Sequence, residues 1–173
     1  EVRDILALDK KFSRFMLVLN VGGVVDLSPV MSVRNILLLS QLGVETGSAL
    51  ADILLGKANP SGKLTTTWAA FENYPAMPDF EDMNETRYRE GIYVGYRYFD
   101  TFGKKALFPF GYGLSYTEFR LGSPEVEVNG AQVTVRTAVE NIGTMAGRQV
   151  VQVYLSKPAV KLDEPKQELC AFA

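Results

Sequence analysis

The chain has 173 residues, which is enough for two small domains at most. Hydrophobic residues make up 47% and charged residues 22%, as in a globular protein rather than a disordered one. The formal net charge of −2 provides no basic surface for nucleic acid or an anionic membrane. The longest apolar stretch, residues 15–25, is interrupted by Asn20, Gly22 and Gly23 and is shorter than the ~20 residues of a spanning helix.

Two scarce residue types narrow the chemistry. Cys170 is the only cysteine, so an internal disulfide is excluded, and we expect Cys170 to be a small buried residue. The chain has no histidine, which removes Ser-His-Asp machinery and the commonest zinc ligand. We expect neither a metal nor a cofactor. The first residues lack the basic and apolar segments of a secretory signal, which leaves the compartment open and slightly favours the cytoplasm over secretion.

The first third of the chain shows the pattern of an α/β protein. Residues 1–12 have helical spacing of apolar side chains. Residues 15–21 and 35–40 are apolar without alternation, as in parallel strands that are buried on both faces. The first of these strands ends at a sharp Gly22-Gly23 turn, and a short element is expected near Pro29.

The next segment continues this alternation. Residues 45–55 predict a helix with an apolar face, Glu45 in its first turn and Gly56 as its stop signal. Residues 59–62, Asn-Pro-Ser-Gly, predict a turn, and the β-branched run 63–68 predicts a strand. Strand, helix and strand in alternation indicate a parallel sheet with helices packed on it.

Two short segments resemble phosphate-binding loops. Residues 19–23 lack the further glycines of a dinucleotide loop. Residues 56–64 have one residue too many between the glycines, no Ser or Thr after the lysine, and a helix in front instead of a strand. A nucleotide-binding α/β protein is therefore disfavoured, and a thermal-shift screen with nucleotides would test it.

Residues 71–100 read as a loop-rich region. The acidic run 79–85 is interpreted as a solvated surface loop, with the rim of a substrate pocket as the alternative. Asn84 begins an N-glycosylation sequon, a motif that is common by chance. The tyrosine-rich segment 91–100 suits either a packing surface or a sugar site, and packing is favoured.

The last third of the chain reads as antiparallel β structure. Residues 125–139 predict two strands around Asn129-Gly130, followed by a turn at 141–147 and a strand at 149–156. The C-terminal residues 169–173 look like a further strand. About 55 residues are too few for a β-sandwich of ~100 residues. We therefore expect another chain or segment to complete both halves.

The segment between the halves, residues 106–119, has the sequence ALFPFGYGLSYTEF. Together with VLNVGGVVDL, LLLSQLGVETGSALADILLGKANPSGKLTTTW and YREGIYVGYRYFDTFG, it resembles the C-terminal part of glycoside hydrolase family 3 enzymes. One departure is Val24, where that family commonly has proline. The resemblance implies the C-terminal part of an α/β sandwich domain (1–105), a connector (106–118) and an incomplete fibronectin type III-like domain (119–173).

The resemblance also implies a retaining, exo-acting β-glycosidase, most readily a β-glucosidase, with β-xylosidase and β-N-acetylglucosaminidase left open. In that family the nucleophilic aspartate belongs to a (β/α)8 barrel, and the acid/base glutamate precedes the segment matched by VLNVGG. Neither motif occurs here, so no catalytic residue is assigned. The carboxylates that could be nominated lack a catalytic context; they are Glu45, Glu81, Glu85, Glu90 and Asp100.

The remaining site candidate is the loop after the first predicted strand. Asn20, Gly22, Gly23 and Asp26 follow its carboxyl end, the edge at which α/β sheets bind ligands. They are predicted to line a carbohydrate pocket, with a purely structural turn as the alternative. Expected partners are a carbohydrate and the rest of the enzyme, with a homo-oligomer left open. A noncatalytic carbohydrate-binding or adhesive module is the second hypothesis for the whole chain.

Overall fold

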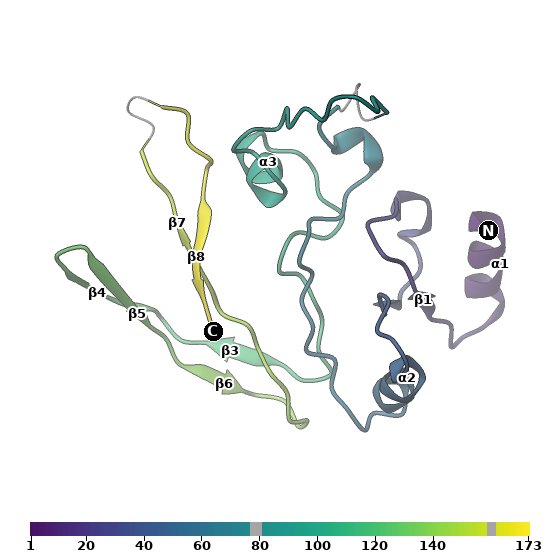
Figure 1. Cartoon of the computed structure of the whole chain (residues 1–173). Coiled ribbons are helices and arrows are strands. Elements are labelled where there is room, and N and C mark those ends of the chain that lie inside the picture. Colours follow the sequence, from purple (N-terminus) through teal and green to yellow (C-terminus); the bar gives the residue numbers. More distant parts are fainter. Residues whose placement is uncertain (77–80, 159–161) are drawn as a thin grey trace.

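The computed structural model describes residues 1–76, 81–158 and 162–173. Its helical elements are α1 (Val2–Lys11), η1 (Ser28–Val30), α2 (Thr46–Leu54), η2 (Phe71–Asn73) and α3 (Tyr96–Thr101). Its strands are β1 (Leu17–Leu19), β2 (Ile36–Leu38), β3 (Phe119–Leu121), β4 (Glu125–Asn129), β5 (Gln132–Arg136), β6 (Val139–Asn141), β7 (Gln152–Leu155) and β8 (Glu168–Phe172). α1, β1 and α2 form one side of the molecule and β3 to β8 the other (Figure 1).

The strands β1 and β2 confirm the predicted parallel pairing. Leu17 lies opposite Ile36, and Leu19 lies opposite Leu38. Each strand has only three residues and is half-buried, so the prediction of longer strands buried on both faces was wrong. Within the described residues the two strands form a sheet by themselves, and a sheet of two strands is too narrow to be enclosed on both faces.

The helix α2 matches the predicted span to within one residue at each end. Gly56 follows it in a left-handed conformation with φ of +69° and donates its N–H to the carbonyl of Ile53 at 3.0 Å. Glu45 lies just outside the helix, at the N-cap, and makes no side-chain capping bond. The hydroxyl of Thr46 instead donates to the carbonyl of Gly43 at 2.6 Å. The prediction that Glu45 lies within the first turn was therefore off by one position.

Residues 63–68 form no regular strand, which corrects the third predicted strand of the parallel sheet. They run antiparallel to the connector: the N–H of Trp68 donates to the carbonyl of Phe108, and that of Leu64 to the carbonyl of Tyr112, each at 2.8 Å. The ladder is interrupted at Gly111, which leaves the extended conformation with φ of +81° and donates its N–H to the carbonyl of Leu64 at 2.8 Å.

The hydrophobic core lies beneath this pairing. Leu27, Val30, Val33 and Trp68 are each only 4% exposed and are in mutual contact. Apolar side chains of α1, β1, β2 and the connector pack around them at partial burial; they include Ile5, Leu6, Leu17, Ile36, Leu107 and Phe108. Trp68 therefore links the connector to the parallel strands.

The second half consists of antiparallel pairs, as predicted. β3 pairs with β6, β4 with β5, and β7 with β8. The β4–β5 turn is centred on Gly130 and Ala131 rather than on Asn129-Gly130, because Asn129 pairs with Gln132 and only Gly130 has the positive φ.

Two further predictions concern whether residues are buried or exposed. Cys170 is exposed on β8, where its thiol donates to the carbonyl of Val153 at 3.3 Å, so the prediction that it is buried was wrong. The face of β8 that carries it is open. In the acidic run, residues 81–85 are exposed, as the surface-loop interpretation requires, whereas 79 and 80 lie outside the described residues.

Candidate functional site

The predicted loop lies at the carboxyl edge of the parallel pair. Gly22 and Gly23 are exposed, and so is Asn20. A Cβ on Gly22 would lie 3.1 Å from Oε1 of Gln41, whereas one on Gly23 would meet nothing within 4 Å. The loops that follow β1 and β2 therefore touch through the Gln41 amide. Sequence reasoning missed Gln41, because no motif connects it to Gly22.

The residue before Gln41 has an unusual backbone. In the described parts of the chain, Ser40 is the only residue other than glycine that has a positive φ, which is +56°. Such a conformation is sparsely populated for residues with a Cβ and persists where neighbouring contacts impose it. It directs the chain after β2 so that the Gln41 amide comes against Gly22.

Asp26 is held by backbone donors. Its Oδ1 accepts from the N–H of Ser28 at 2.9 Å, and its Oδ2 accepts from the N–H of Phe71 at 3.2 Å. A hydrogen bond from the Ser28 side chain, followed by these two N–H groups, lowers the pKa of Asp26 below its ordinary value. The carboxylate thus stays ionised and ties η1 to η2. A sugar-contacting role for Asn20, Gly22, Gly23 and Asp26 stays a prediction.

The nominated carboxylates are scattered. Glu45 and Glu81 are exposed, and Glu85 pairs with Arg87. Glu90 is half-buried, and its Oε2 is buried with no hydrogen-bond partner among the described residues. Asp100 accepts from Nε2 of Gln167 at 2.9 Å. Of these five, only Asp100 lines the cavity described next.

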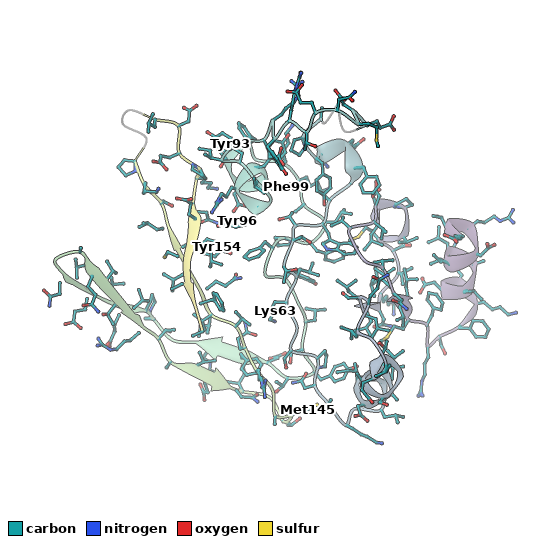
Figure 2. All side chains as sticks on the ribbon, viewed as in Figure 1. Lys63, Tyr93, Tyr96, Phe99, Met145 and Tyr154 are labelled. Carbon is teal, nitrogen blue, oxygen red and sulfur yellow. The ribbon has the colours of Figure 1, made fainter. Side chains whose placement is uncertain are left out.

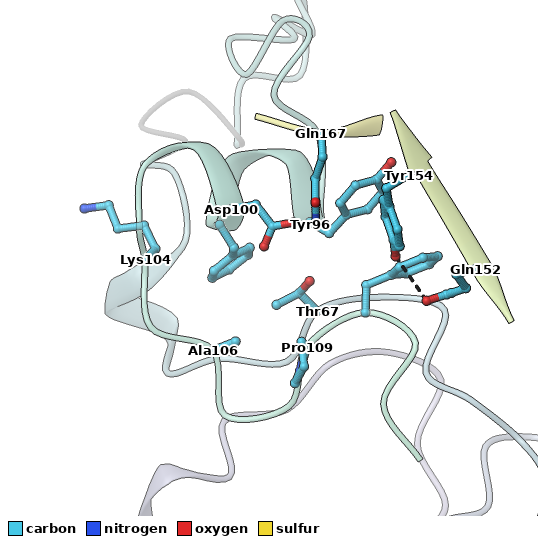
Figure 3. A pocket seen from close by; sticks show the side chains of 11 residues that line it. Thr67, Tyr96, Asp100, Lys104, Ala106, Pro109, Gln152, Tyr154 and Gln167 are labelled. Carbon is cyan, nitrogen blue, oxygen red and sulfur yellow. Dashed lines mark hydrogen bonds between the residues drawn. The ribbon is translucent and has the colours of Figure 1, made fainter. Parts of the chain in front are cut away.

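A cavity of about 300 Å³ lies where α3, the connector and β7 meet. Tyr96, Phe99 and Tyr154 come together at this place, well away from Lys63 in the middle segment (Figure 2). The rings of Tyr96 and Phe110 stack at 4.9 Å between centroids. Burial, followed by the proximity of Tyr96 and Asp100, raises the pKa of the Tyr154 phenol. The Tyr154 hydroxyl donates to Oε1 of Gln152 at 3.1 Å (Figure 3).

Beside the cavity, α3 is held against the β8 region by two hydrogen bonds and one ion pair. The N–H of Leu169 donates to the Tyr96 hydroxyl at 2.7 Å, and the N–H of Lys166 donates to Oγ1 of Thr101 at 3.0 Å. Arg97 forms an ion pair with Glu168 at 3.5 Å. We call this set the α3–β8 interface. Tyr96 and Arg97 of the tyrosine-rich segment therefore pack against the β8 region, as favoured from the sequence.

Asn59 makes a second connection between the halves. Its Oδ1 accepts from Oγ of Ser115 and from the N–H of Tyr116, both at 2.9 Å. Its Nδ2 donates to the carbonyl of Ala146 at 3.1 Å. A Cβ on Gly147 would collide with Nδ2 of Asn59. The Asn-Pro-Ser-Gly turn, the connector and the turn after β6 therefore meet at one amide.

Comparison with known proteins identifies the family of this arrangement. The model of the glycosyl hydrolase family 3 C-terminal domain matches residues 3–116. The chain belongs to glycoside hydrolase family 3. A β-glucosidase of Ruminococcus albus is 42% identical over 165 residues, which are 93% of this chain and 17% of that protein.

Solved structures of the same family agree over nearly the whole chain. β-Glucosidase 3B of Thermotoga neapolitana in complex with glucose has a TM-score of 0.89 and 40% identity, over 100% of this chain and 26% of that one. The β-glucosidase of Kluyveromyces marxianus in complex with glucose has a TM-score of 0.93 and 34% identity, over 99% of this chain and 21% of that one. The chain spans 17–24% of the length of four curated relatives.

Two features of the described residues bear on other kinds of site. No group of three or more His, Cys, Asp or Glu side chains in residues 1–76, 81–158 and 162–173 could hold a metal ion. In the same residues, no helix is both long enough and apolar enough to cross a membrane.

Proposed function

We propose that this chain is part of a retaining, exo-acting β-glucosidase that removes terminal β-linked glucose, and that it supports an active site built largely by a barrel domain outside this sequence. The observation that carries the proposal is the match to β-glucosidases that bind glucose, at 34–40% identity over 99–100% of the chain. The family membership and this match make a glucoside the first substrate to test.

The domain assignment belongs to the same proposal. Residues 1–105 would be the C-terminal part of an α/β sandwich domain, residues 106–118 a connector and residues 119–173 part of a fibronectin type III-like domain. The parallel pair β1–β2 with its helices supports the first assignment, and the antiparallel pairs β3 to β8 support the last. Backbone pairing between 64–68 and 108–112 means that the connector is held against the first unit.

The solvent-accessible surface supports completion by further polypeptide. The chain exposes 12,920 Å², whereas a compact monomer of 19.1 kDa exposes about 8,400 Å². The excess includes apolar side chains on the β4–β5 hairpin, where Val126, Val128 and Val133 are 62%, 68% and 59% exposed. We infer that the rest of the enzyme covers part of this surface.

The chemical step would use two carboxyl groups on either side of the glycosidic bond, as retaining glycosidases do. We assign neither group to this chain. Its part is to position: the Asn59 contacts and the α3–β8 interface fix the second half against the first, and the Gly22-Gly23 loop with Asn20 and Asp26 is proposed to line the pocket. Loops that hold the substrate in a reactive geometry increase the rate of the chemical step.

The test compares two samples. The complete polypeptide that contains this chain should hydrolyse p-nitrophenyl β-D-glucoside faster than the matching β-D-xyloside or β-N-acetylglucosaminide, whereas the 173-residue chain alone should hydrolyse none of them. Native mass spectrometry of the 173-residue chain mixed with the remainder of the polypeptide should show a species far heavier than 19.1 kDa. A complete polypeptide without β-glycosidase activity would contradict the proposal.

A further inference from the structure

Thr67 presents a buried hydroxyl with nothing to bind. The residue is 4% exposed, and its Oγ1 has no hydrogen-bond partner among the described residues. It lies on the wall of the cavity of about 300 Å³ (Figure 3). A buried hydroxyl without a partner is costly, and native structures rarely keep one unless a water or a ligand supplies the bond. The hydroxyl therefore indicates an occupant.

The size of the cavity favours an occupant larger than a single water molecule. The cavity is partly open to solvent, and its volume is well above the share of about 30 Å³ that one water molecule occupies in the liquid. A volume of about 300 Å³ lies at the lower end of the range for small-molecule sites. It would hold a compact ligand of a few to about a dozen heavy atoms.

The polar lining provides both donors and acceptors. The Thr67 hydroxyl can both donate and accept, whereas the Tyr96 hydroxyl is engaged by the N–H of Leu169 on β8, away from Thr67 (Figure 3). Asp100 uses Oδ2 for Gln167, and no partner is recorded for its Oδ1 within the described residues. Figure 3 shows Thr67, Asp100 and Gln167 converging on the same space. Hydroxyl groups, which both donate and accept, complement such a lining.

The charge and the apolar surface of the lining restrict the chemical class of the ligand further. Asp100 supplies negative charge to the lining, whereas the Lys104 side chain points away from the cavity (Figure 3), so the site disfavours an anion. Phe99 and Phe110 supply apolar ring surface, and Phe110 is stacked on Tyr96. A ligand with hydroxyls on its edges and C–H groups on its faces satisfies both parts of the wall.

We propose that this cavity is a second, noncatalytic binding site for a small neutral polyol or monosaccharide, with Thr67 and Asp100 as its polar contacts. The proposal does not depend on glycoside hydrolysis. Thr67 and α3 come from the first half of the chain and Gln152 and Gln167 from the second, so a bound ligand bridges the halves. Binding therefore stabilises the α3–β8 interface by mass action.

The experiment uses the complete polypeptide and three variants at neighbouring threonines. Thr67→Val removes the hydroxyl and keeps the shape, Thr67→Ser restores the hydroxyl, and Thr66→Val is the matched control because Thr66 is exposed on the same segment. Glucose and glycerol are titrated against the melting temperature. Both also stabilise proteins by exclusion from the surface, and that effect is equal in all variants.

We expect the wild type, Thr67→Ser and Thr66→Val to share a second saturable rise, beyond the one from glucose at the proposed active site, and in Thr67→Val the apparent Kd of this second rise should be weakened at least about tenfold. Without ligand, Thr67→Val should be as stable as the wild type or more stable, because it removes an unpaired group. A crystal of the complete polypeptide soaked in glucose should show the sugar within hydrogen-bond distance of Oγ1 of Thr67.

Three results would overturn the proposal: a cavity filled by side chains from elsewhere in the complete polypeptide, a cavity that keeps only water in the soaked crystal, or a second saturable rise that is equal in Thr67→Val and the wild type. Glycosidase activity is measured separately on the same samples. A protein that binds at Thr67 but hydrolyses nothing would contradict the proposed function alone. An active enzyme with an empty cavity would contradict this site alone.

Discussion

Replacing Asn59 by alanine tests whether one amide joins the two halves of the chain. The substitution removes three side-chain hydrogen bonds, to Ser115, to the N–H of Tyr116 and to the carbonyl of Ala146. Each such bond contributes about 0.5–1.5 kcal/mol net. Two of the three lie at exposed positions, where water replaces the lost partner. We therefore expect a loss of about 2 kcal/mol in the free energy of unfolding of the complete polypeptide.

The assay is denaturant unfolding, read together with amide hydrogen exchange. Exchange should accelerate at residues 115–117 and 146–148 and stay unchanged in α1, which is remote from Asn59. Asn59→Asp is the graded control, because it keeps the acceptor for Ser115 and Tyr116 and loses only the donor to Ala146. A loss below about 0.5 kcal/mol for Asn59→Ala, the level of an ordinary surface substitution, would refute the reasoning.

Two further predictions concern backbone packing and pH. Gly113→Ala should destabilise the protein by about 1–3 kcal/mol, because its Cβ would collide with the carbonyl oxygen of Gly62, whereas Gly23→Ala, which faces open space, should change thermal stability little. For Asp26, whose pKa is lowered in the folded state, the stabilisation is present above the unfolded pKa of about 3.9 and is lost as pH falls through the lower folded pKa. The stability difference between wild type and Asp26→Asn, from unfolding curves at pH 6 to 2.5, should therefore shrink below about pH 4. A constant difference would show that the Asp26 charge is not involved.

The parts of the fold that were predictable from sequence depend on local signals. α2 was found because apolar spacing and a stop glycine act within a few residues of each other, and Gly56 has the expected positive φ. The β4–β5 hairpin was found because two alternating strands are joined by a two-residue turn. Its centre was displaced by one residue, since both Asn129 and Gly130 suit a turn and only pairing with Gln132 decides between them.

The predictions that were wrong concern features that depend on residues distant in sequence. Residues 63–68 have the β-branched composition of a strand, but their pairing partner lies about 40 positions later and leaves the extended conformation at Gly111, so the ladder is interrupted. Burial of Cys170 was expected from its residue type, whereas its exposure depends on what packs over β8. A local sequence pattern predicts neither the interrupted pairing of residues 63–68 nor the exposure of Cys170.

Asn59 and Thr67 show the same difference between what a local sequence pattern reveals and what depends on distant residues. The turn chemistry of Asn59 was visible in sequence, but its side chain acts on residues 56 to 87 positions away. Thr67 was read only as part of a β-branched run, and nothing local distinguishes its buried hydroxyl from the exposed one of Thr66. What sets Thr67 apart is the cavity that α3 and β7 close over it. A functional reading of such a residue therefore depends on the pairing of the two halves, and any change that separates them should remove the cavity as well.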